Sequence, residues 1–260
     1  MNILFVGDIF GQPGRVAVGK IIPLLKKKHK IDFVIVNGEN AAGGIGITAD
    51  TARELFDYGV DVITTGNHIW KQKDIIEYIK SEPNLVRPLN FPPETPGKGS
   101  VVIEKKGLKV GVINILGRIF MSEIDCPFRV AAEEIKNISK QTPIIIVDIH
   151  AEATSEKKAI GWFFDGLVSA VVGTHTHVQT ADERILPSGT AYISDVGMTG
   201  SMDSVIGIKR EIAIRRFLTQ LPIKFEVAQD NVQMNAVLLS INKKGKANSI
   251  KRIQVGLGKK

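Results

Sequence analysis

The chain has a single cysteine, Cys126, among its 260 residues. One cysteine cannot form an internal disulfide, so we expect no disulfide framework and a reducing compartment such as the cytoplasm. Clusters of thiolate ligands are excluded as well. Any metal must therefore be held by nitrogen and oxygen ligands.

Long apolar runs are also missing. No stretch has the about 20 apolar residues that a membrane-spanning helix needs. The first residues follow a strand pattern at once, without the basic and apolar regions of a signal peptide. We therefore expect no membrane partner. The chain lacks low-complexity linkers and repeats at solenoid spacing, which predicts one domain over residues 1–260.

Acidic residues are in the minority, and the formal net charge is +7. Part of the basic excess lies in the KKKHK cluster at Lys26–Lys30 and in a tail from Lys243 to Lys260. Such clusters can attract phosphate-bearing partners such as RNA or nucleotides. No aromatic residues interleave with these lysines, as they would on a surface that stacks nucleic-acid bases. We interpret the clusters first as solvated faces and keep RNA binding as an alternative.

The N-terminal part alternates two patterns. Short runs rich in Val and Ile predict buried strands, and the segments between them predict helices. Repeated βαβ units predict a parallel sheet with right-handed crossovers. Thr51 and Glu54 have the spacing of a helix capping box. We expect strands at Asn2–Gly7, Asp32–Asn37 and Asp61–Thr65, and helices over Gly14–Lys28, Thr48–Tyr58 and Lys71–Lys80.

Hairpins enter in the second part. A Pro/Gly-rich loop over Arg87–Gly99 is followed by SVVIEKKGLKVGVINI, which predicts two antiparallel strands. The order of elements predicts an α/β fold, a sandwich of two mixed sheets flanked by helices. The later elements are expected at Phe128–Ser139 (helix), Pro143–Ile149 (strand), Thr154–Glu156 (helix start), Val168–Gly173 (strand), ERILPSGTAYIS (hairpin), KREIAIRRFLTQ (amphipathic helix) and Ile223–Gly256 (strands).

Side chains of the kinds that bind metals follow five of the apolar runs. In open α/β sheets, ligands bind at the carboxyl ends of the strands, so these side chains should meet in one place. Four of the five histidines are among them. The residues are Asp8, Glu39, Asn40, Asn67, His68, His150, His175 and His177.

Structural alternatives exist for single members of this set. Asp8 could cap a turn, and Asn67-His68 could belong to a turn after Gly66. The glycines of AAGGIGIT lack the Lys and Ser/Thr of a phosphate-binding loop, so we interpret them as a sharp turn. In an extended chain, the spacing of His175 and His177 points both rings the same way. Taken together, the residues favour a shared metal site.

Imidazoles, carboxylates and a carboxamide suit Fe, Mn, Zn or Co. The candidate ligands are too many for one ion, and a carboxylate that bridges two ions about 3.5–4 Å apart would use them all. Glu39 is the central carboxylate and the natural bridge. A site with two metals generates metal-bound hydroxide as nucleophile and clamps the oxygens of a displacement at phosphorus. His68 is then the candidate general acid.

At these residues the chain resembles the calcineurin-like metallophosphoesterases. Two departures are that Phe10 replaces the histidine of the first motif and Glu39 replaces the bridging aspartate. These departures, together with the segments VDIHAEATSEK and DVGMTG, make the chain similar to a bacterial branch of the superfamily, the 2′,3′-cyclic-nucleotide 2′-phosphodiesterases. The resemblance runs over essentially the whole chain. The superfamily motifs stand here as GDIF (7–10), NGEN (37–40), GNH (66–68), DIH (148–150) and GTHTH (173–177).

The resemblance implies a four-layer α/β/β/α sandwich and two metal ions, with iron first and manganese or zinc as alternatives. It also implies an enzyme that hydrolyses 2′,3′-cyclic nucleotides and also 3′,5′-cyclic ones, with His68 as proton donor. The protein would form a homo-oligomer. One ion would be held by Asp8, Glu39, Asn40 and His177, and the other by Glu39, Asn67, His150 and His175.

Other classes remain open at this point. An RNA-binding regulator with a structural metal site is one alternative. A metal amidohydrolase is another, but it would place His-x-His on the first strand and add a bridging lysine. Arg87 and Asn90 could contact a substrate phosphate, although a structural role in their loop is favoured. Ser194–Gly200 either edges the pocket or is only a turn.

Overall fold

The computed structural model describes residues 1–258, so Lys259 and Lys260 of the basic tail lie outside the described residues. The first of its two sheets is mixed: β1 runs parallel to β3, and β3 to β4, whereas β12 runs antiparallel to β1. The order is β2-β11-β12-β1-β3-β4, and β13 also pairs with β12. The strands are β1 (Asn2–Val6), β2 (Asp8–Ile9), β3 (Phe33–Asn37), β4 (Val62–Thr64), β11 (Met198–Ser201), β12 (Val232–Ile241) and β13 (Ala247–Gly256).

The second sheet has the order β5-β6-β7-β8-β10-β9. Its central strands β6, β7, β8 and β10 are parallel, and each edge is an antiparallel pair. Both hairpins predicted from the sequence are therefore confirmed. The strands are β5 (Ser100–Lys105), β6 (Leu108–Leu116), β7 (Ile145–His150), β8 (Ala170–Thr174), β9 (Arg184–Ile185) and β10 (Ala191–Ile193).

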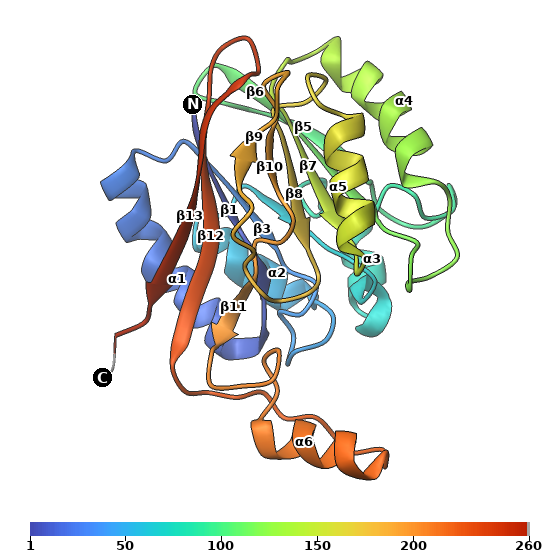
Figure 1. Cartoon of the computed structure of the whole chain (residues 1–260), viewed down its shortest axis with the longest axis vertical. Helices are drawn as coiled ribbons and strands as arrows, with labels where there is room; N and C mark the ends of the chain where they lie inside the picture. The colour runs from blue at the N-terminus through green and yellow to red at the C-terminus, as the bar shows by residue number, and fades with distance from the viewer. Residues whose placement is uncertain (259–260) are drawn as a thin grey trace.

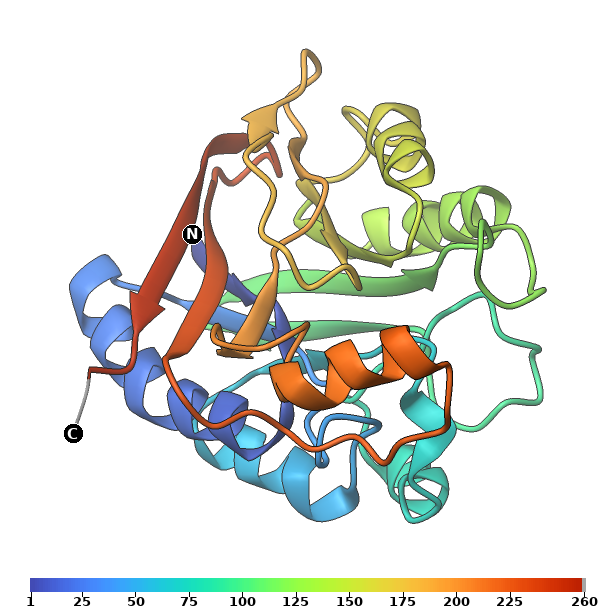
Figure 2. The ribbon, with the colours of Figure 1, turned by 60° about the horizontal axis from the view of Figure 1, so that its bottom comes forward.

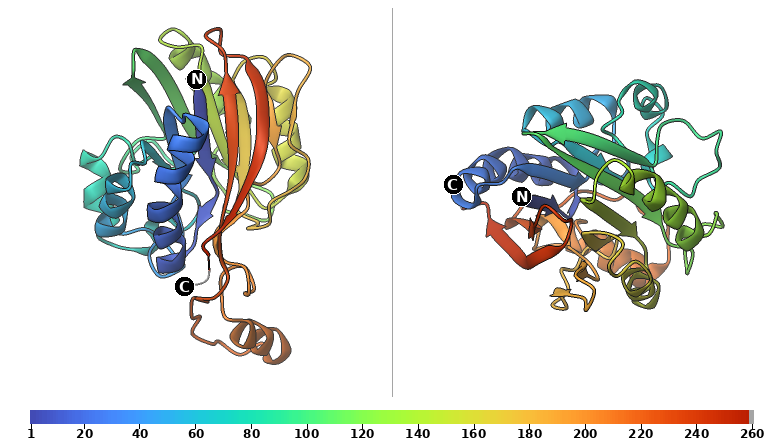
Figure 3. Two further views of the ribbon diagram at one scale, coloured as in Figure 1. Left: turned by 90° about the vertical axis from the view of Figure 1, so that its left-hand side faces the viewer. Right: turned by 90° about the horizontal axis from the view of Figure 1, so that it is seen from above.

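Helices cover the outer faces of both sheets (Figures 1 and 3). Alternate residues of β1 show why: Ile3 and Phe5 pack between the sheets, whereas Leu4 and Val6 pack outward. Both faces are buried, which explains the continuous apolar runs. The expected four-layer α/β/β/α sandwich is confirmed. The helices are α1 (Gly11–His29), α2 (Ala49–Asp57) and α3 (Ile75–Ser81) on the first sheet, and α4 (Pro127–Ser139) and α5 (Thr154–Phe163) on the second.

Several boundaries differ from the sequence prediction. Helix α1 begins at Gly11, and the helix expected over Lys71–Lys80 is a short 3-10 turn followed by α3, because Gln72 is extended. The capping box of α2 pairs Thr48 with Thr51, while Glu54 binds Arg15 instead. These ends depend on contacts between elements that local patterns do not contain.

The amphipathic helix expected in KREIAIRRFLTQ forms as α6 (Arg210–Thr219) but buries only Ala213. It projects away from both sheets (Figure 3, left), and Phe217 and Leu218 are 73% and 80% exposed. The segment from Ile223 to the start of β12, expected to contain strand, forms only an isolated bridge at Val227. Within residues 1–258, no helix combines the length and the apolar character needed to cross a membrane.

Candidate metal centre

The strands that precede the predicted site residues end at the same edge of the sandwich, at the bottom of Figure 1. Parallel pairing within β1-β3-β4 and within β7-β8 brings their carboxyl ends together. Each predicted residue contacts at least one other member of the set. The structure therefore gathers all of Asp8, Glu39, Asn40, Asn67, His68, His150, His175 and His177.

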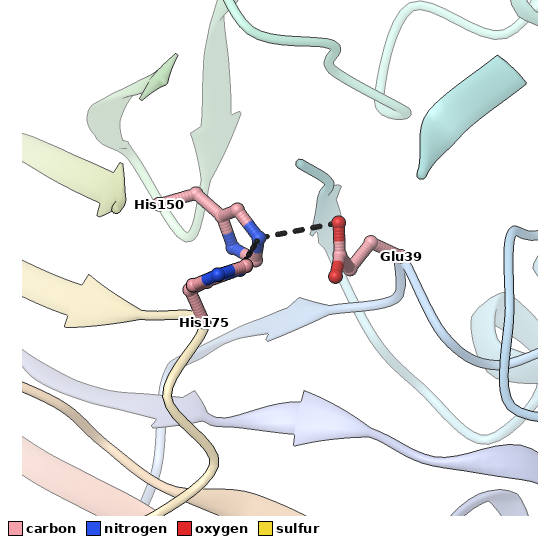
Figure 4. Close-up of side chains that lie close together, drawn as sticks. All are labelled: Glu39, His150 and His175. Atoms are coloured by element: carbon pink, nitrogen blue, oxygen red, sulfur yellow. Dashed lines mark hydrogen bonds and ion pairs between the residues drawn. The ribbon is translucent and has the colours of Figure 1, made fainter. Parts of the chain in front are cut away.

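One group of side chains surrounds His150 Nε2 (Figure 4). This atom lies 3.2 Å from Glu39 Oε2, 3.1 Å from Asn67 Oδ1 and 3.0 Å from His175 Nδ1. Ligand atoms of Glu39, His150 and His175 all lie within 4.8 Å of one another, so one cation can contact all of them. A Cβ at Gly66 would collide with Glu39 and His150, so only glycine leaves this space open.

A second group lies on the other oxygen of Glu39. Asn40 Nδ2 donates to Glu39 Oε1 at 2.8 Å and lies 3.3 Å from His177 Nε2. Asn40 Oδ1 is directed at His68 Nδ1, 2.8 Å away. Glu39 thus separates two groups of potential ligands, and Asn40 must turn its carboxamide to present its oxygen to a cation.

The charges at the centre fit a cation. The carboxylates of Asp8 and Glu39 are both buried, and Asp8 Oδ1 has no hydrogen-bond donor within residues 1–258. Buried carboxylates need a positive partner. Burial alone would lower the pKa of His150, but Glu39 and Asp8 outweigh it and raise that pKa to about 9. The site therefore attracts positive charge, and a metal ion would have to displace the proton of His150.

The histidines after β8 are not in extended chain, contrary to the sequence interpretation. Both His175 and His177 have positive φ, 104° and 66°, which non-glycine residues rarely adopt. Their rings consequently point to different groups, His175 toward His150 and His177 toward Asn40. Both histidines do lie among the other predicted residues, but a strained turn directs them.

Asp148, a buried carboxylate to which the sequence analysis gave no role, helps to hold His150 in place. Asp148 accepts hydrogen bonds from Thr64 at 2.6 Å and from Thr174 at 2.7 Å, and burial raises its pKa to about 6. Because the Thr174 hydroxyl donates to Asp148, it accepts from His150 Nδ1, 2.9 Å away. The Nε2 atom of His150 therefore faces the place of the cation, which would displace its proton. The sequence contained an indication of this role: Asp148 lies two residues before His150, so the two side chains share one face of the strand.

A buried ion pair holds the turn between the two histidines. Lys157 Nζ lies 2.6 Å from Asp195 Oδ2, and the same oxygen accepts from the backbone N–H and the hydroxyl of Thr176 at 2.9 and 2.7 Å. Ser194–Gly200 is therefore more than a turn, because Asp195 anchors the chain that carries His175 and His177.

We expect Lys157→Met to destabilise the fold by about 3–5 kcal/mol, because it leaves the buried charge of Asp195 without a partner. Adding Asp195→Asn should recover part of this loss. Urea unfolding of both variants, with metal content measured on the folded protein, checks the expectation. A single variant as stable as the parent chain would show that the pair does not hold this turn.

The structure agrees with the structural role that we favoured for Arg87 and Asn90 in the Pro-rich loop. Arg87 is buried and donates to the carbonyl groups of Pro88, Thr95 and Pro96, and Asn90 donates to those of Leu116 and Asp125. Both side chains are thus committed to holding the loop.

Comparison with known proteins places the chain in a family. The family described as YmdB-like protein matches residues 4–253. The chain belongs to this YmdB-like family. A Bacillus subtilis member named 2′,3′-cyclic-nucleotide 2′-phosphodiesterase is 52% identical over 98% of this chain and 97% of its own. The family inferred from the motifs is therefore confirmed.

Solved structures support the family and the fold. A structure from Mycoplasma pneumoniae, described as a novel phosphatase, is 38% identical with a TM-score of 0.93, covering 98% of this chain and 93% of that one. A Staphylococcus aureus structure described as a 5′-nucleotidase covers 100% of this chain and 55% of that one. Its TM-score is 0.62 and its identity is 15%, so this similarity supports the fold alone.

Proposed function

We propose that the chain is a metal-dependent phosphoric diester hydrolase that opens 2′,3′-cyclic nucleotides and extends to 3′,5′-cyclic ones. The observation that carries the proposal is the position of Glu39, whose two carboxylate oxygens face two separate groups of ligand side chains. The substrate class follows the name of the Bacillus subtilis relative.

We assign the ligands in two sets that share Glu39. Imidazole, carboxylate and carboxamide groups suit iron, which we place first, and also manganese and zinc. When bound, two such ions supply hydroxide at neutral pH and neutralise charge on the phosphate oxygens. The sets are Asp8, Glu39, Asn40 and His177 for one ion, and Glu39, Asn67, His150 and His175 for the other.

We assign the proton donor to His68. Its Nδ1 atom is held 2.8 Å from Asn40 Oδ1 and 3.3 Å from Glu39 Oε1. The ring is 29% exposed, so its far nitrogen, Nε2, can meet a substrate from the open side. In the reaction, a water molecule releases one proton to solvent, its oxygen bonds to phosphorus, and the bond between phosphorus and the 2′-oxygen breaks. That oxygen takes the proton from His68, and the phosphate stays on the 3′-oxygen.

Metal analysis of anaerobically purified protein, paired with turnover on 2′,3′- and 3′,5′-cyclic substrates, tests this function. We expect about two metal ions per chain, a 3′-monophosphate product from the 2′,3′-ester, and loss of turnover on chelation that iron restores. Folded, metal-loaded protein that hydrolyses neither ester would contradict the proposal. Turnover that survives complete removal of metal would do so too.

Three further expectations remain proposals. The first is that residues 1–260 form one domain. The second is a location in the cytoplasm, because Cys126 has no second cysteine to pair with, and the third is a homo-oligomer. The exposed apolar side chains of α6, including Phe217 and Leu218, offer a surface that a second copy would cover. The mass in solution, compared with 28.4 kDa for one chain, tests the oligomer.

We leave RNA outside the proposal, because the Lys26–Lys30 cluster lies at the end of α1, at the opposite edge of the sandwich from the site (Figure 1).

A further inference from the structure

A cavity of about 290 Å³ opens beside the metal centre, and His177 forms part of its wall. His177 Nε2 faces Asn40 in the metal centre, whereas Nδ1 lies 3.1 Å from the carbonyl oxygen of Ile206, which also lines the cavity. Met198, another lining residue, is paired in register with Asp8. The cavity and the metal centre are therefore neighbours that share one imidazole ring.

The cavity is lined by uncharged side chains, apart from the imidazole of His177. A second phosphate would need cationic partners, which the lining does not offer. Met198, Met202 and Ile206 supply apolar surface, and Gln179, Gln233 and Gln254 supply carboxamides. Apolar walls with a few polar groups are typical of small-molecule sites, and methionine sulfur makes favourable contacts with aromatic rings.

The strand register places two of these carboxamides together. Gln233 and Asn235 lie on one face of β12, and Gln254 of β13 is directly opposite Asn235. Gln233 Nε2 is engaged by Asn235 Oδ1 at 2.7 Å, which leaves Gln233 Oε1 as an acceptor. The exposed side chain of Gln254 makes no hydrogen bond to residues 1–258, so its amide and carbonyl groups are both available.

The carboxamide of the third glutamine, Gln179, is fixed in place. Gln179 Nε2 donates to the carbonyl oxygens of Val196 and Ala236, both at 3.1 Å. Its side chain therefore cannot turn freely, and it forms a rigid wall between His177 and β12. Gln233 and Gln254 are therefore the glutamines whose side chains can turn toward a ligand.

We propose that this cavity binds the purine base of the nucleotide substrate, with Gln233 and Gln254 reading its polar edge. The inference rests on the proposed function, which brings a nucleotide phosphate to the adjoining metal centre. Glutamine pairs with the N6 and N7 positions of adenine through both groups of its carboxamide, so adenine is the best match. Met198, Met202 and Ile206 would contact the faces of the ring.

The test compares a substrate that has a base with one that has none. In the Gln233→Leu/Gln254→Leu double variant we expect KM for 2′,3′-cyclic AMP to rise about ten-fold or more, with kcat little changed. Hydrolysis of bis(p-nitrophenyl) phosphate, which has no base, should stay at the parent rate. Gln141→Leu, an exposed glutamine outside this cavity, is the matched control and should change neither substrate. An unchanged KM for the cyclic nucleotide in the double variant overturns the proposal.

Equilibrium binding separates this inference from the proposed function. We expect metal-loaded parent protein to bind 3′-AMP at least about ten-fold more tightly than inorganic phosphate, and the double variant to lose that preference. If the parent chain hydrolyses neither ester yet shows the preference, the proposed reaction fails while the base site stands. If 3′-AMP and phosphate bind equally to the parent chain, the base site is wrong whatever the turnover.

Discussion

Glu39→Gln is expected to lower turnover of a 2′,3′-cyclic nucleotide by about 100-fold or more and to reduce bound metal. The physical reason is that a carboxamide has one neutral oxygen, whereas the carboxylate of Glu39 presents a charged oxygen to each ligand group. Metal content per folded chain and steady-state rates measure the effect.

Its control is Glu77→Gln on α3, where the side chain is 78% exposed and pairs with Lys80. This variant makes the same chemical change and should keep metal and rate. A Glu39→Gln protein with full metal content and full turnover would show that Glu39 does not bridge two ions.

His68→Ala is expected to keep the metal and the fold but to slow hydrolysis of cyclic nucleotides by about 100- to 10,000-fold. The alkoxide that leaves a cyclic nucleotide needs a proton, whereas p-nitrophenolate does not. The rate on bis(p-nitrophenyl) phosphate should therefore fall far less. Rates on the two substrates, measured with metal content, separate a lost proton donor from a damaged site.

His29→Ala is the matched control, because His29 lies at the end of α1 and its ring makes no hydrogen bond within the described residues. This variant should change neither rate. An unchanged rate of His68→Ala on the cyclic nucleotide would remove His68 from the mechanism, whatever becomes of the metal assignment.

The sequence was sufficient to predict which polar residues meet at the strand ends, because of how sheets are built. A short apolar run with a polar residue at its exit predicts a strand end, and parallel strand ends meet at one edge. Asp8, Glu39 and His150 follow this rule and lie together. Both hairpins and the two helical layers are likewise encoded by local patterns of apolar residues and turns.

Local patterns did not predict how the site is supported. The hydrogen bonds from Thr64 to Asp148 and from Lys157 to Asp195 join residues that are 84 and 38 positions apart. The cavity beside His177 likewise combines side chains from the loop after β8 with others from β12 and β13. No periodicity records such pairs, because they form only when elements that are distant in the sequence pack together.

The position of α6 depends on tertiary contacts in the same way. Its sequence has helical propensity and apolar residues, and the helix does form. Whether the apolar side chains pack depends on a partner surface. With the bottom of the molecule turned forward, α6 lies in front of the sheets (Figure 2), and its side chains Ile214, Phe217 and Leu218 are exposed. Amphipathic periodicity therefore predicted the helix correctly but not its place in the fold.

The sequence by itself determined the elements, their layers and the residues at the strand ends, because strand exits and apolar periods are local properties of the chain. Tertiary structure alone decided the direction of each side chain. The turn anchored by Lys157 and Asp195 directs His175 and His177 to different ligand groups around Glu39, through positive φ angles that no sequence spacing indicates.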